Sequence, residues 1–242
     1  ASGKGTDFQS ILDHINLGVL QDVKPVLLIC NNVDAFALTR ARKAGVKTKY
    51  IEGIVGKKFS DLDSRRDARR KFDSAVIEEL KKHKTTVIAL AGFNQIVSPV
   101  LIDSYSMRVL NIHPAFDTER YGGVGMYGDN VHRAVLANHE SYSGCTVHYV
   151  DNSVDLGPVI LRQRVPIKKD DTIESLSNRI LVWEHRSYSK ALQIHVDNLL
   201  NKNNLSKKDE WEKKWNERQK KYISYQTEHS VEIYGKILNE II

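Results

Sequence analysis

The sequence predicts an α/β protein with a mostly parallel sheet that ends in antiparallel strands. Short apolar runs at residues 26–30 and 86–91 alternate with segments of helical periodicity, which is the pattern of a parallel sheet. The run at 86–91 is apolar throughout, as expected for a strand that helices cover on both faces. Residues 145–150 alternate in polarity and precede a strand at 158–165, so we expect these two strands to pair as an antiparallel extension.

The other elements follow from apolar periodicity and from residues that begin or end helices. Thr6 is expected to cap the first helix, because Gln9 stands where a capping box requires it. Pro114 has no N–H group and should end the preceding strand at His113. Residues 116–127, rich in Gly and Tyr, are expected to form a mobile loop. Helices are expected at 6–18, 35–44, 64–84, 129–138 and 171–200, and further strands at 46–51 and 108–113.

A glycine loop opens the chain. Gly3 and Gly5 allow the backbone to turn sharply before the first helix, whose unpaired N–H groups would attract an anion. Such a loop is also common as a simple connector. Because a strand normally precedes it, we expect a first strand upstream of residue 1. The domain prediction is therefore one domain over 1–200, lacking that strand, and a helical extension over 201–242.

Composition limits the classes of function. The 242 residues carry a formal charge of +6 that is spread along the chain, unlike the concentrated basic face of a dedicated nucleic-acid binder. The apolar runs are shorter than a membrane span, and we recognise no signal peptide, so we expect a cytoplasmic protein. Cys30 and Cys145 lack metal-ligand spacing and are interpreted as reduced packing residues. The basic cluster at 65–71 is interpreted as a solvated helix face rather than an anion site.

The extension over 201–242 differs in composition from the rest of the chain. Trp211 and Trp215 are four residues apart, as are Ile233 and Ile237, so each pair shares a helix face. We favour a helical appendage that packs on the main domain or on a partner chain over a nucleic-acid-binding tail.

Asn111 and His113 carry the candidate chemistry. On an extended strand their side chains point to the same side, at the edge where open α/β sheets bind ligands. Asp155 lies in a turn between the last two strands; if it reaches His113, it would orient the imidazole and favour its protonated form. Such a set suits transfer of an acyl-type group to an amine. A lone strand-end histidine is, however, more often structural.

No other catalytic arrangement is evident in the sequence. No activated serine or cysteine stands out, and His132, His139 and His148 lack the spacing of zinc ligands, so we expect no metal.

At these motifs the chain resembles the phosphoribosylglycinamide formyltransferase family of folate-dependent enzymes. The resemblance rests on the Ser-Gly-Lys-Gly-Thr loop at 2–6, Leu-Ala-Gly-Phe at 90–93, Asn-Ile-His-Pro at 111–114 and Asp-Leu-Gly-Pro at 155–158, with further matches at 34–37 and 144–150. It covers the chain from residue 1 to about residue 196. It implies a Rossmann-like formyltransferase fold and transfer of the formyl group of 10-formyltetrahydrofolate to the amine of glycinamide ribonucleotide in de novo purine biosynthesis.

The resemblance also implies roles for individual residues. The catalytic residues would be Asn111, His113 and Asp155, with Asp155 raising the pKa of His113. The residues that bind glycinamide ribonucleotide would be Gly5, Thr6, Asp7 and Glu184. The residues that bind the folate cosubstrate would be Arg69, Asn94, Gln95, Ile96, Val97 and Asn111. The partners would then be these small molecules, without nucleic acid or membrane, for a monomer or homodimer.

The chain departs from the family pattern at several positions. Asp7 replaces a usual Asn and would repel phosphate if its side chain faced the ligand, so its backbone is the expected contact. Gln95 replaces a frequent Arg, residues 115–118 differ from the usual Ser-Leu-Leu-Pro, and the loop through 122–128 is longer.

Four alternatives stay open. A formyltetrahydrofolate hydrolase would carry an additional N-terminal regulatory domain. A methionyl-tRNA formyltransferase would carry a C-terminal β-barrel, whereas the tail of this chain is predicted to be helical. A sugar N-formyltransferase and a non-catalytic folate- or nucleotide-binding protein also remain.

Overall fold

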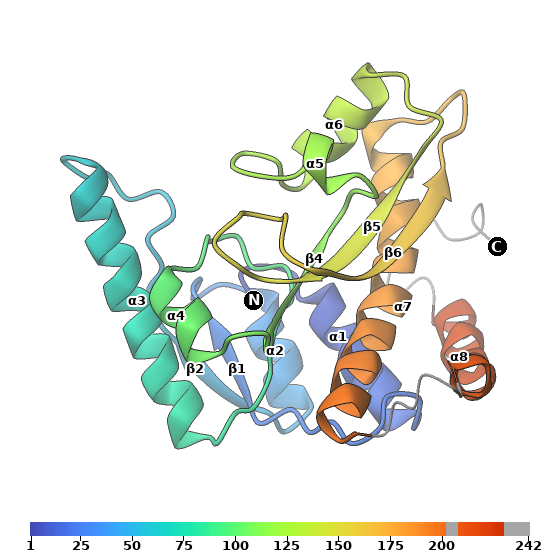
Figure 1. Cartoon of the computed structure of the whole chain (residues 1–242), viewed down its shortest axis with the longest axis horizontal. Helices are drawn as coiled ribbons and strands as arrows, with labels where there is room; N and C mark the ends of the chain where they lie inside the picture. Colours follow the sequence, from blue (N-terminus) through green and yellow to red (C-terminus); the bar gives the residue numbers. More distant parts are fainter. Residues whose placement is uncertain (202–207, 230–242) are drawn as a thin grey trace.

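The strands form two sheets in the computed structural model, which describes residues 1–201 and 208–229 (Figure 1). β1 (Leu27–Cys30) and β2 (Lys47–Tyr50) pair in parallel as a two-stranded sheet. The other sheet has the order β3 (Ile88–Leu90), β4 (Val109–His113), β5 (Tyr142–Tyr149), β6 (Val159–Pro166). β3 and β4 are parallel, whereas β4–β5 and β5–β6 are antiparallel. The predicted α/β class with antiparallel final strands is confirmed, but the single predicted sheet is divided in two.

Helices cover the strands from two sides (Figure 1). One core joins the strands to the helices α1 and α7, and a second core joins them to α3 and α4. The described helices are α1 (Thr6–Asn16), α2 (Phe36–Lys43), α3 (Leu62–Lys82), α4 (Pro99–Ser104), α5 (Thr118–Tyr121), α6 (Asp129–Ala137), α7 (Ile173–Leu199) and α8 (Lys208–Glu228). None of them is long and apolar enough to cross a membrane. The predicted helices are therefore present, with ends shifted by a few residues.

Three local predictions are wrong. The N-cap of α1 is Gly5 and not Thr6; Gly5 has a φ of 71°, and a Cβ there would lie 2.7 Å from Cβ of Ala37, so glycine makes this turn without a side-chain cap. The loop after β4 contains the short helix α5, which Asp117 caps through the amides of Glu119 and Arg120.

The third correction concerns β3. This strand has only three residues, and all three are half-buried although the run was predicted to be covered on both faces. The reason is a cavity along one edge of β3, described below.

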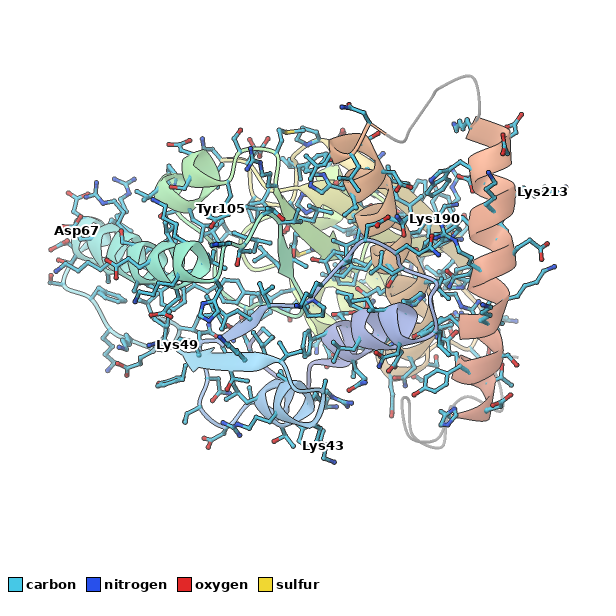
Figure 2. All side chains as sticks on the ribbon, turned by 90° about the horizontal axis from the view of Figure 1, so that it is seen from below. Lys43, Lys49, Asp67, Tyr105, Lys190 and Lys213 are labelled. Carbon is cyan, nitrogen blue, oxygen red and sulfur yellow. The ribbon has the colours of Figure 1, made fainter. Side chains whose placement is uncertain are left out.

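α8 packs against the main body of the protein (Figures 1 and 2). The Tyr222 ring stacks on the buried His14 of α1 with 3.5 Å between ring centroids, and Trp215 is 2% exposed. Lys190 of α7, labelled in Figure 2 on the side that faces α8, forms an ion pair with Glu212 at 2.7 Å. The predicted face with Trp211 and Trp215 is present and its rings stack, whereas the predicted pair Ile233 and Ile237 lies outside the described residues. The domain boundary at residue 200 stays a prediction.

Candidate active site

β4 positions two of the predicted catalytic residues. It is a central strand, paired with β3 on one side and β5 on the other, so its backbone is fixed along both edges. Asn111 and His113 alternate with buried apolar residues at its carboxyl end, where Asn111 is half-buried and His113 is 4% exposed. The strand ends as Pro114 begins the turn, as predicted.

Asp155 reaches both side chains from the turn between β5 and β6. Its Oδ1 accepts a hydrogen bond from Nδ2 of Asn111 at 3.3 Å, and its Oδ2 lies 3.5 Å from Nδ1 of His113. Asp155 has a φ of 61°, and the Gly123 amide donates to its Oδ2 at 3.1 Å. The structure therefore brings the three predicted catalytic residues together, while their role in catalysis stays a prediction.

The contacts of His113 identify which ring nitrogen can exchange a proton. Its Nε2 is 2.7 Å from the carbonyl oxygen of Tyr121, which can only accept, so Nε2 carries a hydrogen. Nδ1, which faces Asp155, is the atom that can gain or lose one. Burial lowers the pKa of His113 more than Asp155 and the Tyr121 carbonyl raise it. The resemblance implied a raised pKa, whereas here the imidazole is neutral at neutral pH, with Nδ1 free to accept a proton.

The Asp155 carboxyl is ionised at neutral pH and gives the site a negative charge. Burial would raise its pKa, but the imidazoles of His148 and His113 and the Gly123 amide outweigh burial, so the pKa lies below its ordinary value. An ionised Asp155 beside Nδ1 stabilises a positive charge that forms on His113 during a reaction.

His148 is a member of this cluster that the sequence did not reveal. It is paired with Asn111 in the register of β4 and β5, and its Nε2 lies 3.3 Å from Nδ2 of Asn111 and 3.7 Å from Oδ1 of Asp155. Its Nδ1 lies 2.9 Å from the Tyr149 carbonyl oxygen, which can only accept, so Nδ1 carries a hydrogen. The alternation of 145–150 could have placed His148 on one face of the hairpin, but the register with β4 could not be read from it.

The Asn111 amide nitrogen thus donates to Asp155 and also lies beside Nε2 of His148. The two contacts, to His148 and Asp155, are each 3.3 Å, which is long for a hydrogen bond. A developing oxyanion can compete for these hydrogens, because catalytic hydrogen bonds in unliganded sites are often long and shorten in the reactive complex.

The loop after α5 closes one side of the cluster. A Cβ at Gly122 would lie 2.4 Å from the Thr118 carbonyl oxygen and 3.0 Å from Cβ of Asp155, so only glycine allows this approach. The same loop exposes Val124 and Tyr127, which are 81% and 68% accessible. It therefore exposes apolar side chains a few residues after Gly123, whose amide contacts Asp155.

The predicted substrate residues lie at the start of α1 and in the middle of α7. Gly5 and Thr6 form the turn into α1, whereas the Asp7 side chain is buried and lies 3.8 Å from Nε2 of His185. Burial raises the pKa of Asp7 to about 6. Burial and the charge of Asp7 raise the pKa of Glu184 well above its ordinary value. The Asp7 carboxyl thus faces the interior, consistent with a ligand contact through its backbone alone.

The predicted folate residues fall into two groups. The amide of the exposed Asn94 donates to Oγ of Ser2 at 3.0 Å, which ties the 92–95 turn to the glycine loop. Gln95 and Val97 are buried, with Oε1 of Gln95 accepting from the Ile54 amide at 2.9 Å, so a ligand here would meet their main chain. Ile96 is half-buried.

Arg69 lies on α3, where its electrostatic partners are Arg65 and Asp73 of the same helix. Asp73 accepts a hydrogen bond from the amide of Ser98, which follows the predicted folate residue Val97. Among the described residues, no three His, Cys, Asp or Glu side chains are placed to hold a metal ion. Cys30 and Cys145 are both buried free thiols.

Comparison with known proteins defines the class of this fold and site. A family model described as formyl transferase matches residues 1–192. The chain belongs to the formyl transferase family.

Two similar proteins bear names that state the same activity. Phosphoribosylglycinamide formyltransferase of Escherichia coli (strain K12) is 32% identical over 199 residues, which are 82% of this chain and 86% of that protein. The crystal structure of glycinamide ribonucleotide transformylase 1 from Symbiobacterium toebii superimposes with a TM-score of 0.70 at 32% identity, covering 81% of this chain and 85% of that one.

A longer relative matches over a small part of its length. The trifunctional purine biosynthetic protein adenosine-3 of Chironomus tentans is 35% identical over 80% of this chain, and the chain spans only 13% of that protein. The fold class and the resemblance predicted from the sequence are confirmed by these comparisons.

Proposed function

We propose that the protein transfers the formyl group of 10-formyltetrahydrofolate to the amine of glycinamide ribonucleotide, a step of purine biosynthesis. The observation that carries the proposal is the contact of Asp155 with both Asn111 and His113 at the carboxyl end of β4. The substrates are small molecules, and we propose a cytoplasmic monomer or homodimer. The names of the relatives support the choice of donor and acceptor.

The first step is attack of the substrate amine on the formyl carbon. A C–N bond forms, the carbonyl π pair moves to oxygen, and the tetrahedral intermediate carries an oxyanion and an ammonium. The Asn111 amide donates to the oxyanion, at the expense of its long contacts with His148 and Asp155. Nδ1 of His113 accepts the ammonium proton, and the imidazolium is stabilised by Asp155.

The second step expels the folate. The oxyanion pair returns to form the carbonyl, the bond from carbon to N10 of the folate breaks, and His113 returns its proton to that nitrogen. The products are the formylated amine and tetrahydrofolate, and His113 is neutral again. No covalent intermediate with the enzyme is needed.

The remaining residues position the substrates. We propose that the backbone amides of Gly5, Thr6 and Asp7 hold the phosphate at the start of α1. Glu184, half-buried on α7, would bind the ribose. The main chain of 94–97 would contact the pterin, beside the glycine loop to which Asn94 is bonded. Arg69 is kept as a candidate for the folate tail.

A panel of acceptors tests this function. The protein is incubated with 10-formyltetrahydrofolate and, separately, glycinamide ribonucleotide, an amino-sugar nucleotide, charged initiator tRNA, or buffer alone. We expect a formylated product only with the ribonucleotide, measured by mass spectrometry. Formate release in buffer alone would identify a hydrolase instead, and formylation of the sugar or the tRNA would contradict the proposed acceptor.

A further inference from the structure

Residues 94–97, the segment proposed to contact the pterin through its main chain, are held at both ends. At the first end, the Asn94 amide donates to Oγ of Ser2 at 3.0 Å. At the second end, the amide of the buried Ser98 donates to Oδ2 of Asp73 at 2.5 Å. A main-chain segment that is fixed at both ends presents its N–H and C=O groups in one arrangement before a ligand arrives.

Asp73 lies on the buried face of α3. Its side chain is fully buried, and its neighbours Phe72 and Val76 belong to the second core. A carboxyl group in such a place costs stability unless hydrogen bonds or an opposite charge offset its burial. Burial raises the pKa of Asp73, and the Ser98 amide and the charge of Arg69 oppose that rise. An apolar side chain would suit the core better, so the role of this carboxyl lies in the groups that it contacts.

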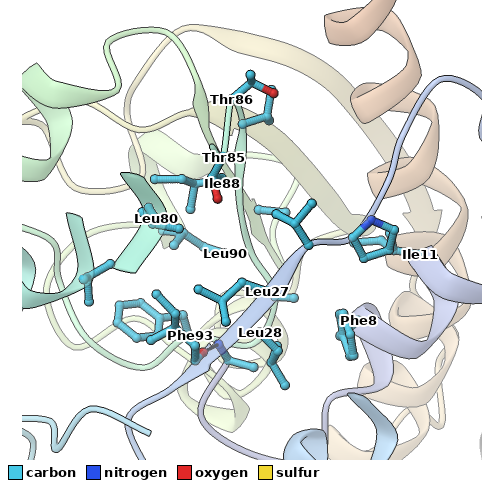
Figure 3. A pocket seen from close by; sticks show the side chains of 18 of the residues that line it. Phe8, Ile11, Leu27, Leu28, Leu80, Thr85, Thr86, Ile88, Leu90 and Phe93 are labelled. Atoms are coloured by element: carbon cyan, nitrogen blue, oxygen red, sulfur yellow. Dashed lines mark hydrogen bonds between the residues drawn. The ribbon is translucent and has the colours of Figure 1, made fainter. Parts of the chain in front are cut away.

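The same carboxyl lines the cavity beside β3, which has a volume of about 270 Å³. Figure 3 shows Leu80 of α3, Leu90 of β3 and Phe93 around this largely apolar space. The other charged side chains of the lining are exposed, whereas Asp73 is buried. Apolar walls do not solvate a carboxylate, so its charge depends on the neighbouring amide and guanidinium groups.

One turn of α3 contacts the segment on both of its sides. The ring of Phe72 stacks on that of Phe93, just before the segment, with 6.3 Å between their centroids. Asp73, the next residue of the helix, binds Ser98 just after the segment. The main chain between these two points therefore rests on a single rigid part of the helix.

Asp73 also acts on the residue that is kept as a candidate for the folate tail. Arg69 stands four residues earlier in α3, which places the two side chains on one face of the helix. Burial and the charge of Arg65 lower the pKa of Arg69, and the charge of Asp73 opposes both. One buried carboxyl thus interacts with the candidate contacts for both ends of the folate.

We propose that Asp73 is a positioning residue for the folate cosubstrate, which holds the main chain of 94–97 through Ser98 and orients Arg69. The inference rests on the proposed function. Loss of Asp73 should weaken the binding of folate much more than that of the ribonucleotide. The glycine loop has an anchor of its own, because the Ala37 amide donates to the Gly3 carbonyl at 3.1 Å.

Calorimetric titration with tetrahydrofolate, the proposed product, tests this role. In Asp73→Ala the buried Ser98 amide loses its acceptor, so the Kd of tetrahydrofolate should rise by roughly tenfold to a hundredfold. The Kd of glycinamide ribonucleotide, titrated separately, should stay near that of the parent. In turnover, KM for 10-formyltetrahydrofolate should rise more than kcat falls. Asp73→Asn keeps an oxygen for the amide and should restore most of the affinity.

Two controls separate positioning from general stability. Glu78→Ala removes an exposed carboxylate of the same helix and should bind both small molecules as the parent does. Hydrogen exchange on the unliganded parent follows the Ser98 amide, which should exchange slowly because Asp73 already holds it. This second measurement does not require any variant to fold.

Three results would overturn the inference. They are an affinity of Asp73→Ala for tetrahydrofolate equal to that of Glu78→Ala, an equal loss of affinity for both small molecules, and rapid exchange of the Ser98 amide in the unliganded parent. A parent protein that does not bind tetrahydrofolate would overturn the proposed function as well. Binding by the parent with unchanged affinity in Asp73→Ala would overturn this inference alone.

Discussion

Nδ1 of His113 lies 3.5 Å from Oδ2 of Asp155, while its other ring nitrogen is held by the Tyr121 carbonyl at 2.7 Å. The ring is therefore fixed from one side, and the proton that it exchanges is confined to the side of the carboxylate. Catalysis in the proposed mechanism depends on this pair more than on any other contact in the site.

Replacing the carboxylate should remove catalysis without unfolding the protein. Asp155→Asn keeps the shape but removes the charge that stabilises imidazolium His113, so we expect kcat to fall by roughly 10²–10⁴. Single-turnover formyl transfer measures the loss, and circular dichroism checks the fold. Asp170→Asn, on an exposed loop, is the matched control and should retain full activity. An active Asp155→Asn protein would rule out the assigned role.

The pH dependence of kcat should report the titration of His113. Burial holds the pKa of His113 below its ordinary value of 6.5, although Asp155 opposes the shift. Neutral Nδ1 accepts the proton, so kcat should fall on the acid side, with a midpoint below pH 6.5. In residual Asp155→Asn activity the midpoint should move to lower pH, because the neighbouring charge is gone. A shift to higher pH would contradict this electrostatic relation.

His148 should act as a positioning residue through Asn111 and Asp155. In His148→Phe the ring nitrogen at 3.3 Å from Nδ2 of Asn111 is lost, and Asp155 loses its contact with the imidazole, the largest of the contacts that lower its pKa. We expect kcat to fall by about tenfold to a hundredfold with KM nearly unchanged, equivalent to about 1.4–2.8 kcal/mol. His139→Asn, at an exposed turn position with positive φ, provides the control. An equal loss in both variants would indicate a general structural effect.

The Asp7 carboxyl should make the folded state less stable as pH rises. Burial raises the pKa of Asp7 in the folded state from 3.8 to about 6, so the native state binds more protons than the unfolded state between these values. Stability is lost as pH rises through this window, by on the order of 1–3 kcal/mol. Asp7→Asn should remove the loss, so that the variant gains stability relative to the parent from pH 4 to 7. Urea denaturation at several pH values measures this difference, and a constant difference would contradict it.

The stacking of Tyr222 on His14 predicts that α8 is part of the cooperative fold. Tyr222 is fully buried, so Tyr222→Ala should lower the free energy of unfolding by about 3 kcal/mol. Ile223→Ala, whose side chain is 38% exposed, should change it by less than about 1 kcal/mol. Thermal unfolding followed by tryptophan fluorescence compares the two. If Tyr222→Ala leaves the midpoint unchanged, α8 unfolds independently of the main body.

The sequence predicted the class of the fold because periodicity and strand-end residues are local signals. It also predicted that Asp155 could meet Asn111 and His113. The structure shows this contact, but the contact depends on a turn at a positive φ and on the Gly123 amide, which no local pattern encodes. His148 was missed because its position follows from strand register.

Other differences have equally physical causes. Thr6 was mistaken for a helix cap because the close packing of Gly5 against Ala37 is a tertiary contact. The division of the strands into two sheets depends on which strands pair in the tertiary structure, which local strand patterns do not show. The pKa of His113 was predicted from its partner alone, whereas burial has the larger effect.

Ser2 joins the two loops to which the substrates are proposed to bind. Its amide donates to Gly92 and its hydroxyl accepts from the Asn94 amide, so the glycine loop is bonded to the turn proposed for the pterin. If the two substrates bind at these loops as proposed, we expect occupancy of one subsite to change the affinity of the second. Thermodynamic reciprocity then requires the factor to be the same in both directions.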